Sequence, residues 1–180
     1  MTYPVFASGD VLNASDMNAV GLWLIKTQSI GTAVSSVTVT GAFSSDYENY
    51  KIIINSGVSS ATDADIRMTL GSTATGYYAA GFYTGGSWGA VVTAQRQTNA
   101  AYWANVAGST STLSGDIELR SPNLAKVTEM FSRTNSASTS GYTNYWAGYL
   151  NDTTQYTAFT LTLGSGTITG GTIRVYGYRN

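Results

Sequence analysis

From Leu22 onward, the hydrophobic residues of this chain recur at every second position. The pattern is clearest in five short runs, which are residues 37–40, 66–70, 117–120, 159–163 and 173–176. Successive side chains of an extended strand point to opposite faces, so a period of two predicts antiparallel strands with one face in the core and one face in water. Segments rich in glycine, serine, threonine and asparagine separate the runs and favour turns. The alternating pattern and the turn segments therefore predict an all-β fold.

The number and spacing of these runs limit the possible architectures. Counting them between turn segments predicts about nine to eleven strands, which fits a two-sheet sandwich of the jelly-roll kind or a closed barrel. We expect an antiparallel β-sandwich of jelly-roll type over residues 22–180. No helical pattern of crossover length follows residue 21, which argues against a parallel architecture with helices between its strands.

Three segments carry more specific expectations. Residues 49–55 have a nearly continuous apolar centre, which predicts a central strand that is covered on both faces or lies at a subunit contact. Residues 77–106 have a weaker pattern, and we expect longer loops there. Residues 170–180 read as a strand, which predicts that the C-terminal segment is held in a sheet.

Residues 1–21 differ from the rest of the chain. Pro4 disfavours a helix at Tyr3, which predicts an extended start. Asn13 is a candidate helix N-cap with Asp16 three residues later, so a short helix is expected over residues 13–20. A helix this short is marginal by itself and must dock on its own domain or on another protein. We expect an attachment arm that contacts a particle through apolar residues, which are Tyr3, Val5, Phe6, Val11, Leu12 and Met17.

Composition excludes several classes of function. The chain has no cysteine and no histidine, so disulfides, zinc sites built from those residues and histidine-dependent triads are absent. A net charge of −1 with 11% charged residues offers no electrostatic attraction for nucleic acid or an anionic membrane. There is no membrane-spanning apolar run and no signal-peptide pattern at the start. We expect no enzymatic activity, cofactor, metal, nucleic-acid binding or membrane insertion.

Two carboxylate pairs have a spacing that a cation site or a glycosidase could use, and they are Asp63 with Asp65 and Asp116 with Glu118. The simpler interpretation is that these are solvated carboxylates on turns and strand faces. A lysine could act as the base for a serine or threonine nucleophile, but no lysine sits in a recognisable nucleophile motif.

Aromatic residues are the stronger candidates for binding. A sugar presents an apolar ring face edged with hydroxyls, which suits a flat tyrosine or tryptophan flanked by polar residues. Trp88 stands in a glycine-rich segment, where local packing does not explain a large ring. The candidate glycan-binding residues are Trp88, Tyr83, Tyr78 and Trp103. The alternative is that these rings fill the sandwich or a subunit interface, and that role is favoured for Tyr142, Tyr145, Trp146 and Tyr149.

Two ends of the chain resemble a known group of proteins. Residues 6–18 fit the pattern F-x-x-G-D-x-L-x-A-x-x-M-N, which resembles the opening of many structural proteins of tailed bacteriophages. Residues 171–177 resemble the last strand of jelly-roll domains in phage tail fibres. Residues 47–52 and 70–74 are also similar to that group.

This resemblance implies a virion protein made in the host cytoplasm. It implies a small tail-fibre-like, head-fibre or decoration protein that attaches to the tail or capsid by its N-terminal arm and displays a β-domain, usually as a homotrimer. Two functions follow from it. One is an oligomeric appendage that contacts host-surface carbohydrate as a receptor-binding protein. The alternative is a capsid decoration or head-fibre protein with a purely structural role and no receptor binding.

Overall fold

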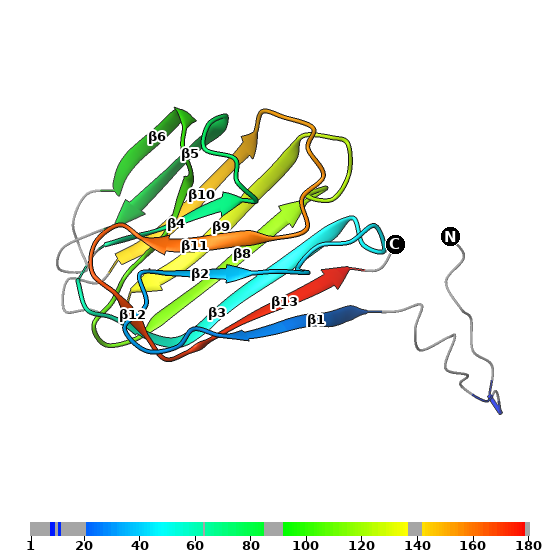
Figure 1. The fold of residues 1–180 in the computed structure, drawn as a ribbon, viewed down its shortest axis with the longest axis horizontal. Coiled ribbons are helices and arrows are strands. Elements are labelled where there is room, and N and C mark those ends of the chain that lie inside the picture. Colours follow the sequence, from blue (N-terminus) through cyan, green and yellow to red (C-terminus); the bar gives the residue numbers. More distant parts are fainter. Residues whose placement is uncertain are drawn as a thin grey trace.

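The structure is a computed structural model that describes residues 8–9, 11, 21–62, 64–84, 92–136 and 142–178. Within these ranges the chain forms thirteen β-strands and no helix (Figure 1). The all-β prediction is therefore confirmed, with more strands than the nine to eleven expected. The short helix expected over residues 13–20 lies outside the described residues.

The strands form two antiparallel sheets. The larger has the order β1 (Leu22–Ser29), β13 (Thr172–Tyr178), β3 (Asn49–Ser59), β8 (Leu113–Arg120), β9 (Thr128–Ser136), β10 (Tyr142–Leu150), β5 (Tyr77–Thr84) and β6 (Val92–Ala100), with β12 (Ile168–Thr169) paired to β3. The smaller has the order β2 (Ser36–Val39), β11 (Phe159–Leu163), β4 (Asp65–Leu70) and β7 (Trp103–Ala107). In Figure 1 the smaller sheet lies in front of the larger one.

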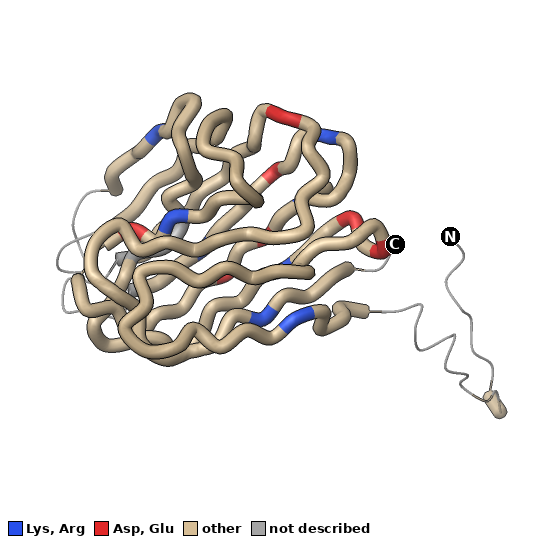
Figure 2. The backbone as a smooth tube through the Cα atoms, viewed as in Figure 1, with Lys and Arg blue, Asp and Glu red and all other residues tan. Residues whose placement is uncertain are grey.

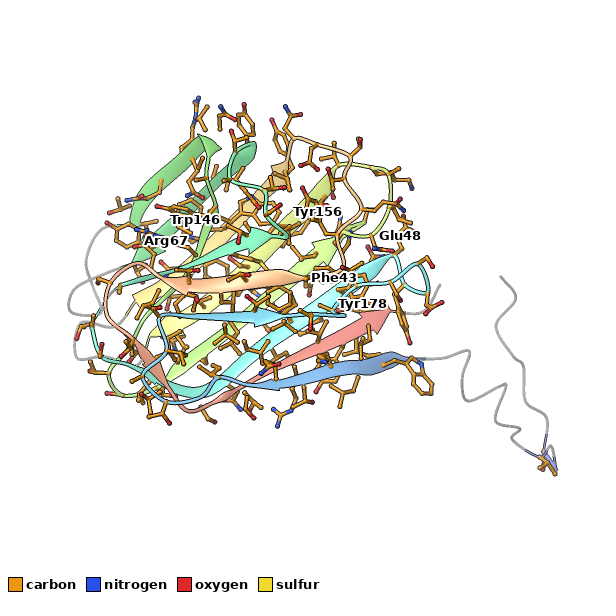
Figure 3. All side chains as sticks on the ribbon, viewed as in Figure 1. Phe43, Glu48, Arg67, Trp146, Tyr156 and Tyr178 are labelled. Carbon is orange, nitrogen blue, oxygen red and sulfur yellow. The ribbon has the colours of Figure 1, made fainter. Side chains whose placement is uncertain are left out.

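The core lies between the two sheets and is built by the alternation that the sequence shows. Its buried side chains come from both layers and include Tyr50, Ile52, Ile54, Ile66, Met68, Leu70, Ile117, Leu119, Phe159, Leu161, Ile173 and Val175. Phe43, labelled in Figure 3, contacts the rings of Tyr50 in β3 and Phe159 in β11, at centroid distances of 4.9 and 5.7 Å. One apolar layer therefore joins the sheets, as in a β-sandwich.

Strand β3 is central, as residues 49–55 predicted, because it pairs with β13 on one side and β8 on the other. Its two faces are not equally covered. Tyr50, Ile52 and Ile54 are buried against the smaller sheet, whereas Lys51 and Ile53 on the other face are half-buried. The expectation that both faces are covered is therefore not met in the single chain.

The expectation of longer loops in residues 77–106 is wrong for the described part of that segment. It contains β5, β6 and β7, and only residues 101–102 separate the last two. The pattern is weak because nearly every residue of β6 is exposed, so no alternation between a buried and a wet face marks this edge strand. The predicted closing strand is confirmed, since β13 pairs with β1 and β3.

Charged residues are sparse and spread over both sheets (Figure 2). Within the described ranges, the chain has no helix long and apolar enough to cross a membrane.

Candidate functional site

Two aromatic pairs stand on the outer face of the larger sheet, which is the face turned away from the smaller sheet. Tyr145 of β10 is directly opposite Phe82 of β5, and Tyr149 is directly opposite Tyr78. Both pairs are stacked, with centroids 5.2 and 5.1 Å apart and ring planes inclined by 25° and 6°. Cross-strand pairs of this kind each stabilise a sheet by about 0.2–1 kcal/mol, so the four rings hold one another in place.

A hollow separates these pairs. Ala147 and Ala80 are opposite each other between them and carry no side-chain bulk. A depression of about 440 Å³ lies over the two alanines and is bordered by Phe82, Tyr145 and Phe131. A second depression of about 330 Å³ shares the alanines and is bordered by Tyr78 and Tyr149. The larger depression is of the size of small-molecule binding sites, which start at roughly 300 Å³.

Four charged residues line the larger depression on the side of β8 and β9, and they are Asp116, Glu118, Arg120 and Arg133. Asp116 Oδ2 lies 3.2 Å from Lys51 Nζ and 3.3 Å from Arg133 Nη2. The guanidinium carbon of Arg120 lies 4.6 Å from the centre of the Phe131 ring, and its Nη1 lies 3.4 Å from Glu129 Oε2. The depression therefore offers hydrogen-bond donors and acceptors from two acidic and two basic side chains.

The opposite face of the same strands is packed. Trp146 of β10 is half-buried against the core, and Figure 3 labels it. A Cβ atom at Gly81 would lie 2.8 Å from Cδ2 of the Trp146 ring, closer than real Cβ contacts, so glycine is required beneath this indole. Trp146 therefore supports the aromatic face from behind.

The four candidate glycan-binding residues are not gathered at one site. Tyr78 stands on the outer face, whereas Tyr83 stands on the opposite face of β5. Trp103 is fully buried, donates from Nε1 to the backbone oxygen of Tyr78 at 3.3 Å and packs edge-on against Tyr77. A ring with no exposed surface cannot stack on a sugar, so Trp103 is a core residue in this chain. Trp88 lies outside the described residues.

Of the six attachment residues, the structure describes Val11 alone, and its side chain is 79% exposed. Tyr3, Val5, Phe6, Leu12 and Met17 lie outside the described residues. The first strand, β1, begins at Leu22.

Two of the carboxylates that the sequence analysis singled out, Asp65 and Asp116, are paired with cations. Asp65 Oδ2 lies 3.2 Å from Arg67 Nε, and Asp116 bridges Lys51 and Arg133. Asp63 lies outside the described residues. Across the described ranges, no group of three or more acidic, histidine or cysteine side chains could hold a metal ion.

Sequence reasoning missed the residues that border the hollow. It assigned Tyr145 and Tyr149 to core and interface, and each is 42% exposed on the outer face of the single chain, so neither belongs to the core of that chain. The available signal was the spacing of Tyr145, Ala147 and Tyr149, which places a small residue between two rings on one face of a strand. Phe82 and Phe131 come from other strands, so only the pairing of β5, β9 and β10 brings them to the same surface.

The fold and this surface define a two-sheet antiparallel β-protein with a concave, partly aromatic face on its larger sheet. A scan against protein-family models and a search of curated proteins found no match to the chain. Its function is therefore inferred from the fold, the outer sheet face and the sequence patterns.

Proposed function

We propose that the protein is a non-enzymatic structural protein of a tailed-bacteriophage virion, an oligomeric appendage that displays a jelly-roll sandwich. Residues 1–21 anchor it to other virion proteins, and residues 22–180 form the displayed domain. The observation that carries this proposal is the nested pairing of the strands, which favours a type of fold found in viral capsid proteins and in lectins.

Four strand pairs are nested in the sequence, because each pair lies between the two strands of the pair before it. β2 pairs with β11, β3 with β8, β4 with β7, and β5 with β6. The members of the first and third pairs lie in the smaller sheet and those of the second and fourth in the larger sheet. This order is the one expected when a long hairpin folds back and forth across two sheets, and it supports the proposed jelly-roll type. β9 and β10 are then an extra hairpin between β8 and β5, and β1 and β13 extend the other edge.

Two further features support a structural and binding role over catalysis. The chain contains no histidine or cysteine, the residues used most often for acid–base and nucleophilic steps. Exposed apolar side chains also stand on the two edge strands of the larger sheet, at Leu22 and Leu24 in β1 and at Val92 in β6. Closed symmetric assembly is the common way of covering such surfaces, and we propose a homotrimer.

Labelled particles test the proposal. Antibodies raised against residues 22–180 are applied to purified phage particles from the lysate in which the chain is made, and the same particles are analysed by mass spectrometry. The appendage role predicts that the chain is present in stoichiometric amounts and that the label lies on the tail. Label over the capsid surface would favour the decoration or head-fibre alternative. A chain that is missing from washed particles would contradict both roles.

A further inference from the structure

We propose that the outer face of the larger sheet carries a carbohydrate-binding site for neutral oligosaccharides. We call this site the sheet-face groove, and we define it by Phe82, Asp116, Tyr145 and Ala147 in the larger depression and by Tyr78 and Tyr149 in the smaller one. The inference deepens the proposed function and rests on it for its biological setting, a virion protein that meets the host surface. Its chemistry rests on the groove alone.

The apolar part of the groove fits the ring faces of sugars. Tyr145 and Tyr149 are four residues apart on β10, and a strand rises about 3.4 Å per residue, so the two aromatic pairs are separated by about 14 Å. This span holds more than one pyranose ring, which favours an oligosaccharide over a monosaccharide. The alanine floor leaves the space between the pairs open, and the stacked rings are ordered before a ligand arrives, which lowers the entropy lost on binding.

The polar part of the groove fits the sugar hydroxyls. A hydroxyl both donates and accepts, so a sugar needs carboxylates and guanidiniums together, and Asp116 and Glu118 stand beside Arg120 and Arg133. The ion pairs of Asp116 with Lys51 and Arg133, and the contact of Arg120 with Phe131, hold these groups in place. Two acids and two bases leave the lining of the larger depression without net charge, which favours a neutral ligand over an anionic one there. Arg96 adds one positive charge at the smaller depression.

The same residues argue against a protein partner on this face. The fully buried centre of a protein interface is depleted of charged residues, whereas four charged side chains line the larger depression of this groove. A second copy seated here would cover them and would have to fill a hollow of about 440 Å³. The observations therefore favour a small, hydroxyl-rich ligand, and a contact between copies becomes an outcome of the test.

The experiment uses the purified full chain and a printed array of neutral tetrasaccharides built from hexoses and N-acetylhexosamines, with sialylated and uronate-containing glycans beside them. The best neutral tetrasaccharide is then titrated by calorimetry against four variants. Ala147→Arg fills the floor, Tyr145→Ser removes a ring and Tyr145→Phe keeps it. Ala125→Arg is the matched control, because Ala125 is exposed in the turn between β8 and β9, outside the groove.

We expect the wild-type chain and Ala125→Arg to bind equally, and Tyr145→Phe to stay close to them. Tyr145→Ser should weaken binding about fivefold, the loss of one stacking ring, and Ala147→Arg should weaken it at least about tenfold. Folding of each variant is checked by circular dichroism, and its molar mass by light scattering.

Three results would overturn the inference. The first is no binding to any neutral tetrasaccharide, or binding to the acidic glycans alone. The second is binding that Ala147→Arg and Tyr145→Ser leave unchanged. The third is an assembly that falls apart in Ala147→Arg, because the face would then join copies of the chain. The sugar-binding experiment uses the purified chain, so a negative result there does not contradict the virion proposal. Equally, absence of the chain from phage particles does not contradict its binding to a sugar.

Discussion

Trp103 and Tyr145 are both aromatic strand residues, yet Trp103 is fully buried while Tyr145 is 42% exposed. Trp103 packs between the sheets against Tyr77 with centroids 4.9 Å apart. Tyr145 stacks on Phe82 on the outer face. The two rings have similar surroundings in the sequence, and the sheet face on which each lies decides whether it contributes to stability or is available to a ligand.

This difference predicts contrasting effects of substitution on the free energy of unfolding. Trp103→Ala should lower it by about 3–5 kcal/mol, because a large buried ring is removed and a cavity remains. Tyr145→Ser should lower it by about 1 kcal/mol or less, because the lost contact is a surface cross-strand pair. Urea denaturation followed by far-UV circular dichroism measures both. Equal losses would contradict the placement of Trp103 in the core.

Tyr77 is a second residue whose role follows from burial. Its hydroxyl accepts a hydrogen bond from the Leu70 backbone N–H at 2.8 Å and donates to the Thr73 carbonyl at 3.1 Å. Burial raises the pKa of the Tyr77 phenol well above its ordinary value of about 10. Burial also raises the pKa of Tyr50 and Tyr156. The fold therefore holds these phenols in the neutral form.

The sign of the pH effect follows from linkage. Above about pH 10 the unfolded chain releases the Tyr77 proton while the folded chain keeps it, so the free energy of unfolding decreases as pH rises. Tyr77→Phe should lower stability at pH 7 by about 1–3 kcal/mol through the unpaired Leu70 N–H, and should lose less stability between pH 9 and 11 than the wild type. Urea unfolding across this range measures both effects, with the exposed Tyr178→Phe as control. An unchanged pH slope in Tyr77→Phe would contradict the prediction.

At the scale of elements, the β1 edge of the larger sheet is joined to the rest of the sheet by one strand, β13. β1 begins at Leu22 and pairs with β13 through Ser29, and β13 pairs with β3 along its full length. β13 therefore joins β1 to the rest of the sheet, and Ile173 and Val175 place its inner face in the core. No described strand pairing involves a residue before Leu22.

This pairing predicts that residues 1–20 can be removed without unfolding the sandwich. The truncated chain should retain the circular dichroism spectrum and cooperative thermal unfolding of an all-β domain, and it should be missing from purified particles because its anchor is gone. Deletion of residues 172–180 is the control and should give an insoluble chain, because it opens the edge of β3 and removes core side chains. An insoluble product of the first deletion would place residues 1–20 in the core.

At the scale of the whole molecule, the two sheets are unequal. The larger has eight strands on its path plus β12, and the smaller has four, with β5 and β6 at one end of the larger sheet (Figure 1). Nearly every residue of β6 is exposed in the single chain, including Val92 at 56%. Leu22 and Leu24 are exposed at the opposite edge. Two edges with apolar side chains and little charge favour association.

We therefore expect the purified chain to be a homotrimer, with a mass three times the 19.0 kDa of one chain. Multi-angle light scattering at micromolar concentration measures this directly, and repeating it at high salt separates apolar contacts from screened charge contacts. Closed symmetry predicts one stable species that does not grow with concentration. A stable monomer of 19.0 kDa would contradict the prediction.

The sequence by itself determined the all-β class and most of the core. The period of two is a local property of extended backbone, so Ile66, Met68 and Leu70 could be assigned to a buried face without knowledge of their neighbours. The same rule failed at β6, where both faces meet solvent and no alternation remains.

The tertiary structure alone decided which strands are neighbours and which rings meet. Ala80 and Ala147 are far apart in the chain, and only the register of β5 against β10 makes them one floor. Phe131 and Arg120 join that surface through the pairing of β9 with β10 and with β8. Register depends on long-range contacts that no local period encodes. The sequence therefore identified aromatic residues as candidates, and the pairing of distant strands selected those that border a groove.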